Sequence, residues 1–256
     1  MAENTESASI MALETEDIAG KAVVITGGTT GIGRTTALLL ASRGAKVLVF
    51  GRHEPELNDA MTDLRELSQD VHGLVADVSS IDDIRRVFQE ADERLGGVDI
   101  LINNAALAAE GALDKDYIDW EYVVRTNLLG YIGCVQEAAH RMKERGGGHI
   151  VNIGSMSADV REEGSSVYVA TKAGIQGFSE ALRKEVNKFG IKVTLIEPGK
   201  TGTDMQDSTP EEQRREEAEG KMLRAEDVAA CVYYCLTQPK RCDVVEVRLR
   251  PHEQKI

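Results

Sequence analysis

The sequence alternates short apolar runs with helix-forming segments along most of its length, and this alternation limits the folds open to it. The runs typical of buried strands are Ala22–Ile25, Lys46–Phe50, Val71–Ala76, Ile100–Ile102, His149–Ile153, Val193–Ile196 and Val244–Leu249. Helical patterns fill the intervals, for example Gly33–Arg43, Pro55–Leu67, Ile81–Leu95, Tyr117–Arg145, Ser166–Phe189 and Ala225–Leu236. Strands joined by crossover helices form parallel sheets that are covered on both faces. The pattern predicts an α/β fold of three layers, doubly wound, with a mostly parallel seven-stranded sheet.

One domain accounts for this pattern, because no linker, repeat or low-complexity segment interrupts it. We expect residues 1–18 to be a disordered or loosely attached tail and residues 19–256 to form a single domain. Residues 200–220 break the pattern, since they are polar, rich in Thr and Glu, and follow a predicted strand. A segment of that kind is typical of a mobile lid over a binding site.

Charge and composition argue against several classes of partner. The formal net charge is −13 and the isoelectric point is about 4.9, whereas nucleic acids and anionic membranes demand a basic surface. The amino terminus lacks the basic and apolar segments of a signal peptide, and no apolar stretch approaches the ~18 residues of a membrane span. We expect a cytoplasmic protein with a small-molecule substrate.

The four cysteines, Cys134, Cys231, Cys235 and Cys242, are too scattered to indicate a disulfide framework. Cys231 and Cys235 have a spacing that a metal could use on a helix. No third or fourth ligand accompanies them at a plausible spacing, so buried thiols of the core are favoured and no metal site is predicted.

A glycine-rich turn, Thr26-Gly27-Gly28-Thr29-Thr30-Gly31-Ile32-Gly33, follows the first predicted strand and precedes a helix. This arrangement brings backbone N–H groups and the positive end of the helix dipole against a pyrophosphate. Glycine is needed because a Cβ would clash with the ligand or forbid positive φ angles. A tight strand-to-helix turn without a ligand is the alternative, but the flanking strand and helix favour dinucleotide binding.

The residues after the second and third strands indicate which dinucleotide is bound. The second strand ends in Gly51-Arg52 and offers no carboxylate for the 2′-hydroxyl of NAD(H), whereas the guanidinium of Arg52 suits a 2′-phosphate. NADP(H) is therefore predicted and NAD(H) is the lesser alternative; a solvated strand end remains the other interpretation of Arg52. Asp77, followed by Val78, could bind the adenine amino group or cap a helix.

Tyr168 and Lys172 lie four residues apart in a predicted helix and therefore share one face. An ammonium ~5 Å from a phenol would lower the pKa of the phenol by about two units at an effective dielectric near 20. Such a tyrosine is a usable general acid and base. Ser155, just after the fifth strand, could stabilise charge on a substrate oxygen. Asn127 interrupts an apolar run, either as a satisfied buried amide or as a group that holds a water near Lys172.

Taken together, these motifs resemble the short-chain dehydrogenase/reductase family over essentially the whole chain. The resemblance is carried by the turn at 26–33, the segment Asn103-Asn104-Ala105-Ala106, the thirteen-residue interval from Ser155 to Tyr168, and Pro198-Gly199. It implies a Rossmann fold and a hydride transfer between nicotinamide and a carbonyl or alcohol. The catalytic residues that it implies are Asn127, Ser155, Tyr168 and Lys172.

The cofactor-binding residues follow from the turn, the strand ends and the resemblance. They are Gly27, Thr29, Thr30, Gly31, Ile32, Gly33, Arg52, Asp77, Val78, Asn103, Tyr168, Lys172, Pro198, Gly199, Thr201 and Thr203. By the resemblance, Asn103 would contact the adenosine side, the Thr201 backbone the carboxamide, and Thr203 would lie near the phosphates. Lys172 would hold the nicotinamide ribose, and Asn127 would maintain the proton relay.

Two departures from the family pattern are visible. Ala106 stands where glycine is usual, which could tighten the cofactor pocket, and the usual Asp-Gly-Gly ending is missing. The ending present, 242–252, resembles NADP-dependent members that act on 3-hydroxy acids and aldehydes. Arg161 and Lys200 hint at a small polar or acidic substrate. The family commonly pairs its long helices, so Tyr117–Arg145 and Val167–Phe189 are expected to form a homodimer or homotetramer.

Two other function classes fit the sequence less well. A non-catalytic regulatory protein that senses NADP(H) would show a decayed set of catalytic residues, whereas all four are present. An epimerase or dehydratase of the extended relatives would need a larger carboxyl-terminal substrate domain than this chain has. An NADP(H)-dependent oxidoreductase is the leading prediction.

Overall fold

Seven parallel strands form one sheet in the order β3-β2-β1-β4-β5-β6-β7 in the computed structural model, which describes residues 14–206 and 208–254. The strands are β1 (Ala22–Thr26), β2 (Lys46–Gly51), β3 (Val71–Val75), β4 (Ile100–Asn103), β5 (Gly148–Ile153), β6 (Ile191–Pro198) and β7 (Glu246–Leu249). The predicted fold class is confirmed, and the sheet is entirely rather than mostly parallel. The chain order reverses between β1 and β4, where doubly wound sheets bind ligands.

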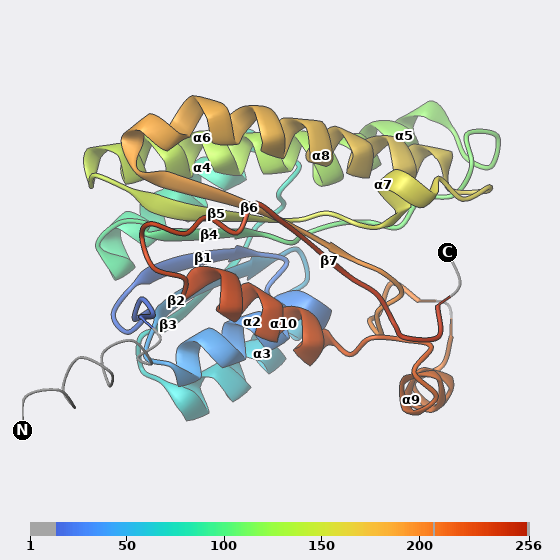
Figure 1. The fold of residues 1–256 in the computed structure, drawn as a ribbon, viewed down its shortest axis with the longest axis horizontal. Helices are drawn as coiled ribbons and strands as arrows, with labels where there is room; N and C mark the ends of the chain where they lie inside the picture. The colour runs from blue at the N-terminus through green and yellow to red at the C-terminus, as the bar shows by residue number, and fades with distance from the viewer. Residues whose placement is uncertain (1–13, 207, 255–256) are drawn as a thin grey trace, which may run out of the picture.

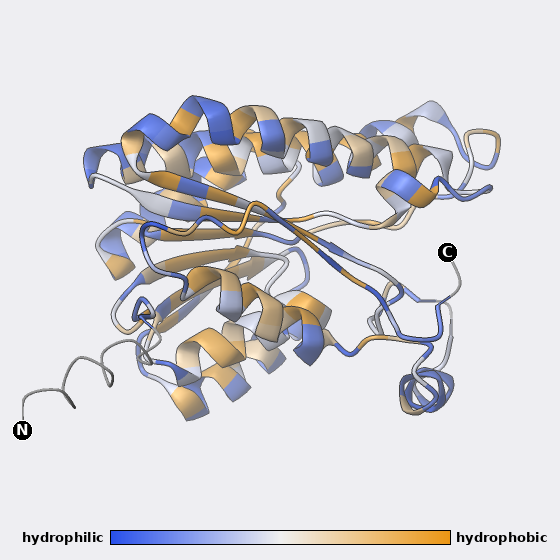
Figure 2. Ribbon diagram, in the orientation of Figure 1, coloured by the Kyte–Doolittle hydropathy of each residue, from blue (hydrophilic) through white to orange (hydrophobic). Residues whose placement is uncertain are grey.

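Two layers of helices cover the sheet (Figure 1). One layer contains α2 (Gly31–Ser42), α3 (Glu54–Leu67) and α10 (Ala225–Leu236). The other contains α4 (Ile81–Leu95), α6 (Gly130–Glu144) and α8 (Ser166–Val186). Every residue of β1 and β4 is buried because helices cover both faces, and the central strands are correspondingly hydrophobic in Figure 2.

Local sequence signals set the helix ends where the prediction is most accurate. The Ser80 hydroxyl accepts a hydrogen bond from the Asp83 N–H at 3.3 Å and caps the start of α4. Gly96 ends the same helix with a φ of +79°, which glycine adopts without strain. The predicted bounds of α4 and α10 agree with the structure.

The long helix predicted over Tyr117–Arg145 is interrupted. The structure has α5 (Tyr117–Val124), a π-helical segment η1 (Arg125–Leu129) and then α6. The hydrophobic pattern cannot reveal such a change, because an inserted π-turn alters helix phase by one residue while the segment stays helical. Two short helices, α7 (Ser157–Val160) and α9 (Pro210–Ala218), were also not predicted. The η2 segment (Asn187–Phe189) extends α8 as a 3₁₀ turn.

The part of the predicted tail that the structure describes, residues 14–18, is attached to the domain. The Glu16 N–H donates to the Thr237 carbonyl at 2.8 Å, and Ile18 is buried in the core beside α2 and α10. Residues 1–13 lie outside the described part, so the expected loose tail stays a prediction there.

The sequence predicts neither a membrane-spanning segment nor a metal site, and the described residues can be compared with both predictions. Within residues 14–206 and 208–254, no helix combines the length and apolar character needed to cross a membrane. Cys134, Cys231 and Cys235 are buried free thiols, and Cys242 is exposed. The described residues contain no metal-binding group of three His, Cys, Asp or Glu side chains.

His149 on β5 makes stability depend on pH. Its Nε2 lies 2.8 Å from the Thr194 hydroxyl, and burial followed by the charge of Lys192 lowers the pKa of His149 to about 3. An unfolded imidazole titrates near pH 6.5, so between about pH 6.5 and 3 the unfolded chain binds the extra proton. This stabilising contribution is complete above pH 6.5 and is lost as the pH falls toward 3.

We therefore expect His149 to contribute a slope of up to about 1.4 kcal/mol per pH unit to the free energy of unfolding in that window. Urea unfolding of wild type and His149→Gln at pH 7 and pH 5 measures it. The difference between the two proteins should change with pH, whereas the exposed His140→Gln should track wild type. A constant difference for His149→Gln would contradict this assignment.

Candidate active site

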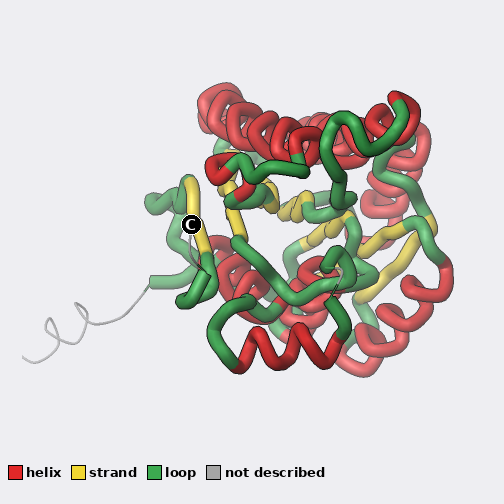
Figure 3. The backbone as a smooth tube through the Cα atoms, turned by 90° about the vertical axis from the view of Figure 1, so that its right-hand side faces the viewer, coloured by secondary structure: helices red, strands yellow, loops and turns green. Residues whose placement is uncertain are grey.

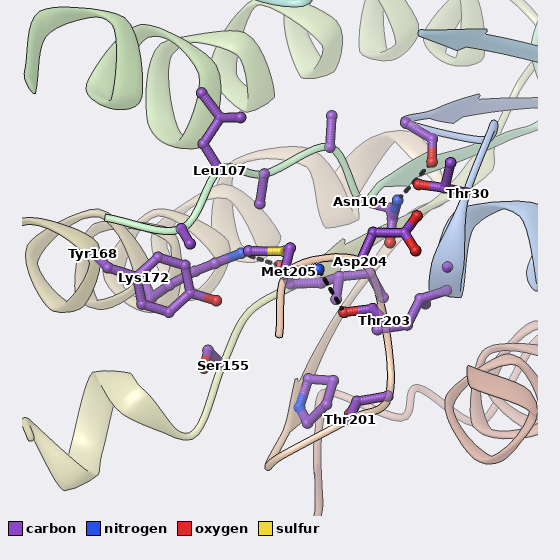
Figure 4. Close-up of a pocket in the computed structure, with 18 of the residues that line it drawn as sticks. Thr30, Asn104, Leu107, Ser155, Tyr168, Lys172, Thr201, Thr203, Asp204 and Met205 are labelled. Atoms are coloured by element: carbon purple, nitrogen blue, oxygen red, sulfur yellow. Dashed lines mark hydrogen bonds between the residues drawn. The ribbon is translucent and has the colours of Figure 1, made fainter. Parts of the chain in front are cut away.

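A cavity of about 1030 Å³ opens at the carboxyl ends of the strands. The loops that line it gather on the side of the molecule facing the viewer in Figure 3. At this edge each strand end leads directly into a loop or helix, so residues distant in sequence meet there. Figure 4 shows Tyr168, Lys172 and Ser155 at one end of the cavity and Thr30 and Asn104 at the other.

Most residues predicted for the site line this cavity. They are Gly27, Thr29, Thr30, Gly31, Ile32, Arg52, Val78, Ser155, Tyr168, Lys172, Pro198, Gly199, Thr201 and Thr203. Four predicted residues do not line it. They are Gly33, Asp77, Asn103 and Asn127.

The glycine-rich turn is closed by contacts that leave no room for side chains. Gly27 and Gly31 have φ angles of +61° and +51°. A Cβ on Gly33 would lie 2.1 Å from the Gly27 carbonyl oxygen, so the helix start packs directly on the turn. Thr30, the N-cap of α2, makes no side-chain capping bond, and the first two residues of this helix, Gly31 and Ile32, line the cavity. This cradle fits a pyrophosphate.

Of the two asparagines at the end of β4, the one predicted to contact the cofactor, Asn103, does not line the cavity. Asn103 is completely buried, and its Nδ2 donates to the Asn152 side chain at 3.0 Å, so it holds β4 to β5. Asn104 lines the cavity instead and donates to the carbonyls of Thr26 and Gly27 at 3.1 and 3.0 Å. Successive side chains of a strand point to opposite faces of the sheet. Because Asn103 is buried, the strand geometry alone predicts that Asn104 points the other way.

At the β2 end of the cavity, Arg52 lines the wall and contacts Tyr122, which no sequence motif singles out. Its guanidinium donates to the Tyr122 hydroxyl, which in turn donates to Asp77 Oδ2 at 2.7 Å. Asp77 also accepts the Ser79 N–H at 2.8 Å. Burial alone would raise the pKa of Asp77, but hydrogen bonds from Ser79 and Tyr122 and the Arg52 charge lower it. Asp77 is thus a fixed anion that orients Tyr122.

The Tyr168 and Lys172 side chains face each other on one side of α8, as the four-residue spacing predicts. Lys172 Nζ lies 5.7 Å from the centre of the Tyr168 ring and 5.5 Å from that of Tyr131. The Lys172 side chain is 2% exposed, and its Nζ donates to the Ile153 carbonyl at 3.0 Å. The end of β5 therefore positions the amine.

The pKa of Tyr168 does not shift in the direction expected from Lys172. Burial raises the pKa of Tyr168, a hydrogen bond with Ser155 opposes the rise, and the Glu162 charge adds to it. Burial also lowers the pKa of Lys172 to about 8, although the negative charge of Glu197 opposes this. The simple two-charge estimate neglected both desolvation effects.

Asn127 acts through the backbone in this structure. It lies in the π-helical segment, is completely buried, and exchanges two hydrogen bonds with the backbone of Leu107, at 2.7 and 2.8 Å. Its Nδ2 also lies 3.4 Å from the Thr171 hydroxyl on α8. Asn127 thus holds a cavity-lining loop, through Leu107, against the helix that carries Tyr168 and Lys172. Single π-turns are frequent at functional sites.

The segment after β6, where the lid is predicted, lines the cavity, and its mobility stays a prediction. Figure 4 shows Thr201, Thr203, Asp204 and Met205 between the two ends of the cavity. The Thr203 methyl would lie 3.2 Å from a Cβ on Gly31, so the segment contacts the glycine-rich turn. Its following part is the capped helix α9.

The charges near Tyr168 differ from the expected basic surroundings. Arg161 is exposed and does not line the cavity, and Lys200 is paired with Glu216 at 2.6 Å. Glu162 lines the cavity and accepts a hydrogen bond from the Ser157 hydroxyl at 2.5 Å. Lys200 lines the cavity but its charge is compensated by Glu216, so the expected small polar or acidic substrate stays a prediction.

Comparisons with known proteins agree with this geometry. The family model described as short chain dehydrogenase matches residues 21–214. An uncharacterized oxidoreductase of Staphylococcus aureus strain USA300 is 34% identical over 233 residues, 90% of this chain and 97% of that protein. A similar uncharacterized oxidoreductase of Staphylococcus epidermidis is 32% identical over 232 residues, again 90% of this chain and 97% of the relative.

Solved structures show the same fold. A short chain dehydrogenase from Burkholderia cenocepacia J2315 in complex with NADP has a TM-score of 0.81 and 26% identity, covering 92% of this chain and 98% of that one. A short-chain type dehydrogenase/reductase from Mycobacterium marinum has a TM-score of 0.82 and 25% identity, covering 92% and 96%.

Proposed function

The chain belongs to the short-chain dehydrogenase family, and from this premise we propose that it is an NADP(H)-dependent oxidoreductase that interconverts a carbonyl and an alcohol. The observation that carries the proposal is a single cavity with a phosphate cradle at one end and Ser155, Tyr168 and Lys172 at the other. When bound across this cavity, the nicotinamide cofactor supplies or accepts the hydride.

The protein's own residues would orient the substrate and move a proton. In the reducing direction, Ser155 donates a hydrogen bond to the carbonyl oxygen while the Tyr168 hydroxyl gives its proton to that oxygen. In the oxidising direction, Tyr168 accepts the alcohol proton. The Lys172 ammonium stabilises the phenolate that remains after reduction, because opposite charges attract strongly in a poorly hydrated site.

Activity is tested by following NADPH and NADH oxidation with purified protein and a panel of aldehydes, diketones, β-keto acids and keto-sugars. Turnover of at least one neutral carbonyl with NADPH is the expected result. Tight NADPH binding with no turnover across the panel would favour a non-catalytic sensor instead.

Arg52 supports the choice of NADP(H), since it is the cation that lines the adenosine end after β2. A charge-assisted hydrogen bond to the 2′-phosphate is worth about 1.5–3 kcal/mol, or roughly one to two decades of affinity. Arg52→Ala should therefore raise the KM for NADPH by about 10- to 100-fold and change that for NADH much less.

Steady-state kinetics with both cofactors measure this ratio, and Arg85→Ala provides a control because Arg85 is exposed and lies outside the cavity. Equal losses for NADPH and NADH would count against a contact between Arg52 and a 2′-phosphate. The Tyr122 hydroxyl holds the Arg52 guanidinium in place, so Tyr122→Phe should weaken the same preference more mildly.

A further inference from the structure

Glu197 on β6 is a fully buried carboxylate to which the proposed reaction gives no role. Its side chain is 0% exposed, and its Oε1 has no hydrogen-bond partner among the residues that the structure describes. A buried carboxylate is costly unless neighbouring groups compensate its charge. The compensating groups therefore indicate what this charge does.

The other oxygen of Glu197 is held from two sides. Glu197 Oε2 lies 3.2 Å from Arg248 Nε on β7 and accepts a hydrogen bond from Gln176 Nε2 on α8 at 3.4 Å. Arg248 is shared with Asp159 on α7, at 2.8 Å, and with Glu246 on β7, also at 2.8 Å. One guanidinium thus serves three carboxylates, so it compensates Glu197 only in part.

Lys172 lies beside the same short stretch of backbone as Glu197. Its Nζ donates to the carbonyl of Ile153, the last residue of β5. At the next residue, Gly154, a Cβ would lie 3.3 Å from Glu197 Oε1 and 3.1 Å from Glu197 Cγ. Gln176, which bonds the carboxylate, follows Lys172 by one turn of α8 and shares its helix face. The amine and the carboxylate therefore both lie beside the end of β5, without a direct ion pair between them.

The negative charge of Glu197 affects the pKa of Lys172. Burial lowers the pKa of Lys172, and Glu197 is the charge that opposes this effect. Burial raises the pKa of Glu197, the Gln176 hydrogen bond and the Arg248 charge oppose that rise, and Glu246 and Asp159 add to it. The other groups facing Lys172 are the rings of Tyr131 and Tyr168.

We propose that Glu197 is a positioning residue of the proton relay, whose buried negative charge keeps the neighbouring Lys172 in its ammonium form. The proposal rests on the oxidoreductase function proposed above, because the ammonium matters through the Tyr168 phenolate that it stabilises. Glu197 touches neither the substrate pocket nor the cofactor cradle, and it acts through Lys172 alone.

The first test is the pH profile of carbonyl reduction by wild type and Glu197→Gln. The glutamine keeps the size of the side chain and removes its charge. Because the ammonium is then less stable, the alkaline loss of kcat should begin at a pH lower by about 0.5 to 1 unit. The KM for NADPH should change little, and Glu197→Asp should restore part of the wild-type midpoint.

The matched control is Glu246→Gln. Glu246 bonds the same Arg248 nitrogen but is 43% exposed, so its loss should leave the midpoint unchanged. A midpoint that is the same in wild type and Glu197→Gln, or one that Glu246→Gln shifts equally, would overturn the proposal.

The second test needs no enzymatic activity, so it separates this proposal from the proposed function. Urea unfolding is measured from pH 6.5 to 9 for wild type, Glu197→Gln, Lys172→Met and the double variant. Folded Lys172 has a pKa of about 8, below that of the unfolded side chain, so the folded state is penalised by the buried ammonium at low pH.

The loss of stability caused by Glu197→Gln should therefore be greatest below about pH 7 and shrink as the pH rises through about 8. In the Lys172→Met background the loss should not vary with pH over this range. A pH-independent loss in both backgrounds would reduce Glu197 to a structural role and overturn the proposal.

Discussion

Tyr168→Phe is expected to reduce turnover by about 10²- to 10⁴-fold, because it removes only the hydroxyl that donates and accepts the proton. The ring, which packs 5.7 Å from the Lys172 amine, remains in place. The affinity for NADPH should therefore stay within a few-fold of wild type, as measured by protein-to-cofactor fluorescence transfer beside steady-state kinetics.

The exposed Tyr234→Phe serves as the control and should keep full activity. If Tyr168→Phe retains most of its turnover, another group carries the proton and the proposed mechanism is wrong. If it loses NADPH binding instead, its main role lies in the cofactor site.

Gly33→Ala is expected to have the second-largest effect, on cofactor binding. The new Cβ would lie 2.1 Å from the Gly27 carbonyl oxygen and 2.5 Å from Asn104 Nδ2, so the glycine-rich turn must move. Overpacking of this kind costs about 1–3 kcal/mol, which corresponds to an NADPH affinity lower by about 5- to 150-fold if the cradle bears that cost.

Gly177→Ala is the matched control, because a Cβ there meets nothing within 4 Å and the residue lies within α8. It should bind NADPH like wild type and be slightly more stable, since alanine favours helices. Isothermal titration with NADPH compares both variants. Unchanged affinity in a folded Gly33→Ala would contradict a pyrophosphate bound at this turn.

The strands and most helices could be predicted from the sequence because their signals are local. Alternating apolar runs, the capping Ser80 and the terminal Gly96 each act within a few residues. The spacing of Tyr168 and Lys172 predicts their shared face for the same reason. These features depend on chain geometry and hardly at all on distant contacts.

The features that could not be predicted depend on tertiary contacts. Asn103 points inward because Asn152 on the neighbouring strand accepts its hydrogen bond. Asp77 accepts a hydrogen bond from the hydroxyl of Tyr122, which lies on a helix distant in sequence. The raised pKa of Tyr168 follows from burial, which a pairwise estimate of charges omits. The placement of Glu197 beside Gly154 is of the same kind, since it needs the register of β5 and β6.

The π-turn at Arg125–Leu129 sets the rotation of α6 relative to α5, which together form an otherwise continuous helix. Each residue advances an α-helix by about 100°, so the additional residue in this turn rotates everything after it by that amount relative to a regular helix. Upstream of it, Tyr122 contacts Arg52 at the cavity wall; downstream, Tyr131 is buried beneath the Lys172 amine. A chain shortened by one residue here would form a smoother helix, yet it could satisfy only one of these two orientations at a time.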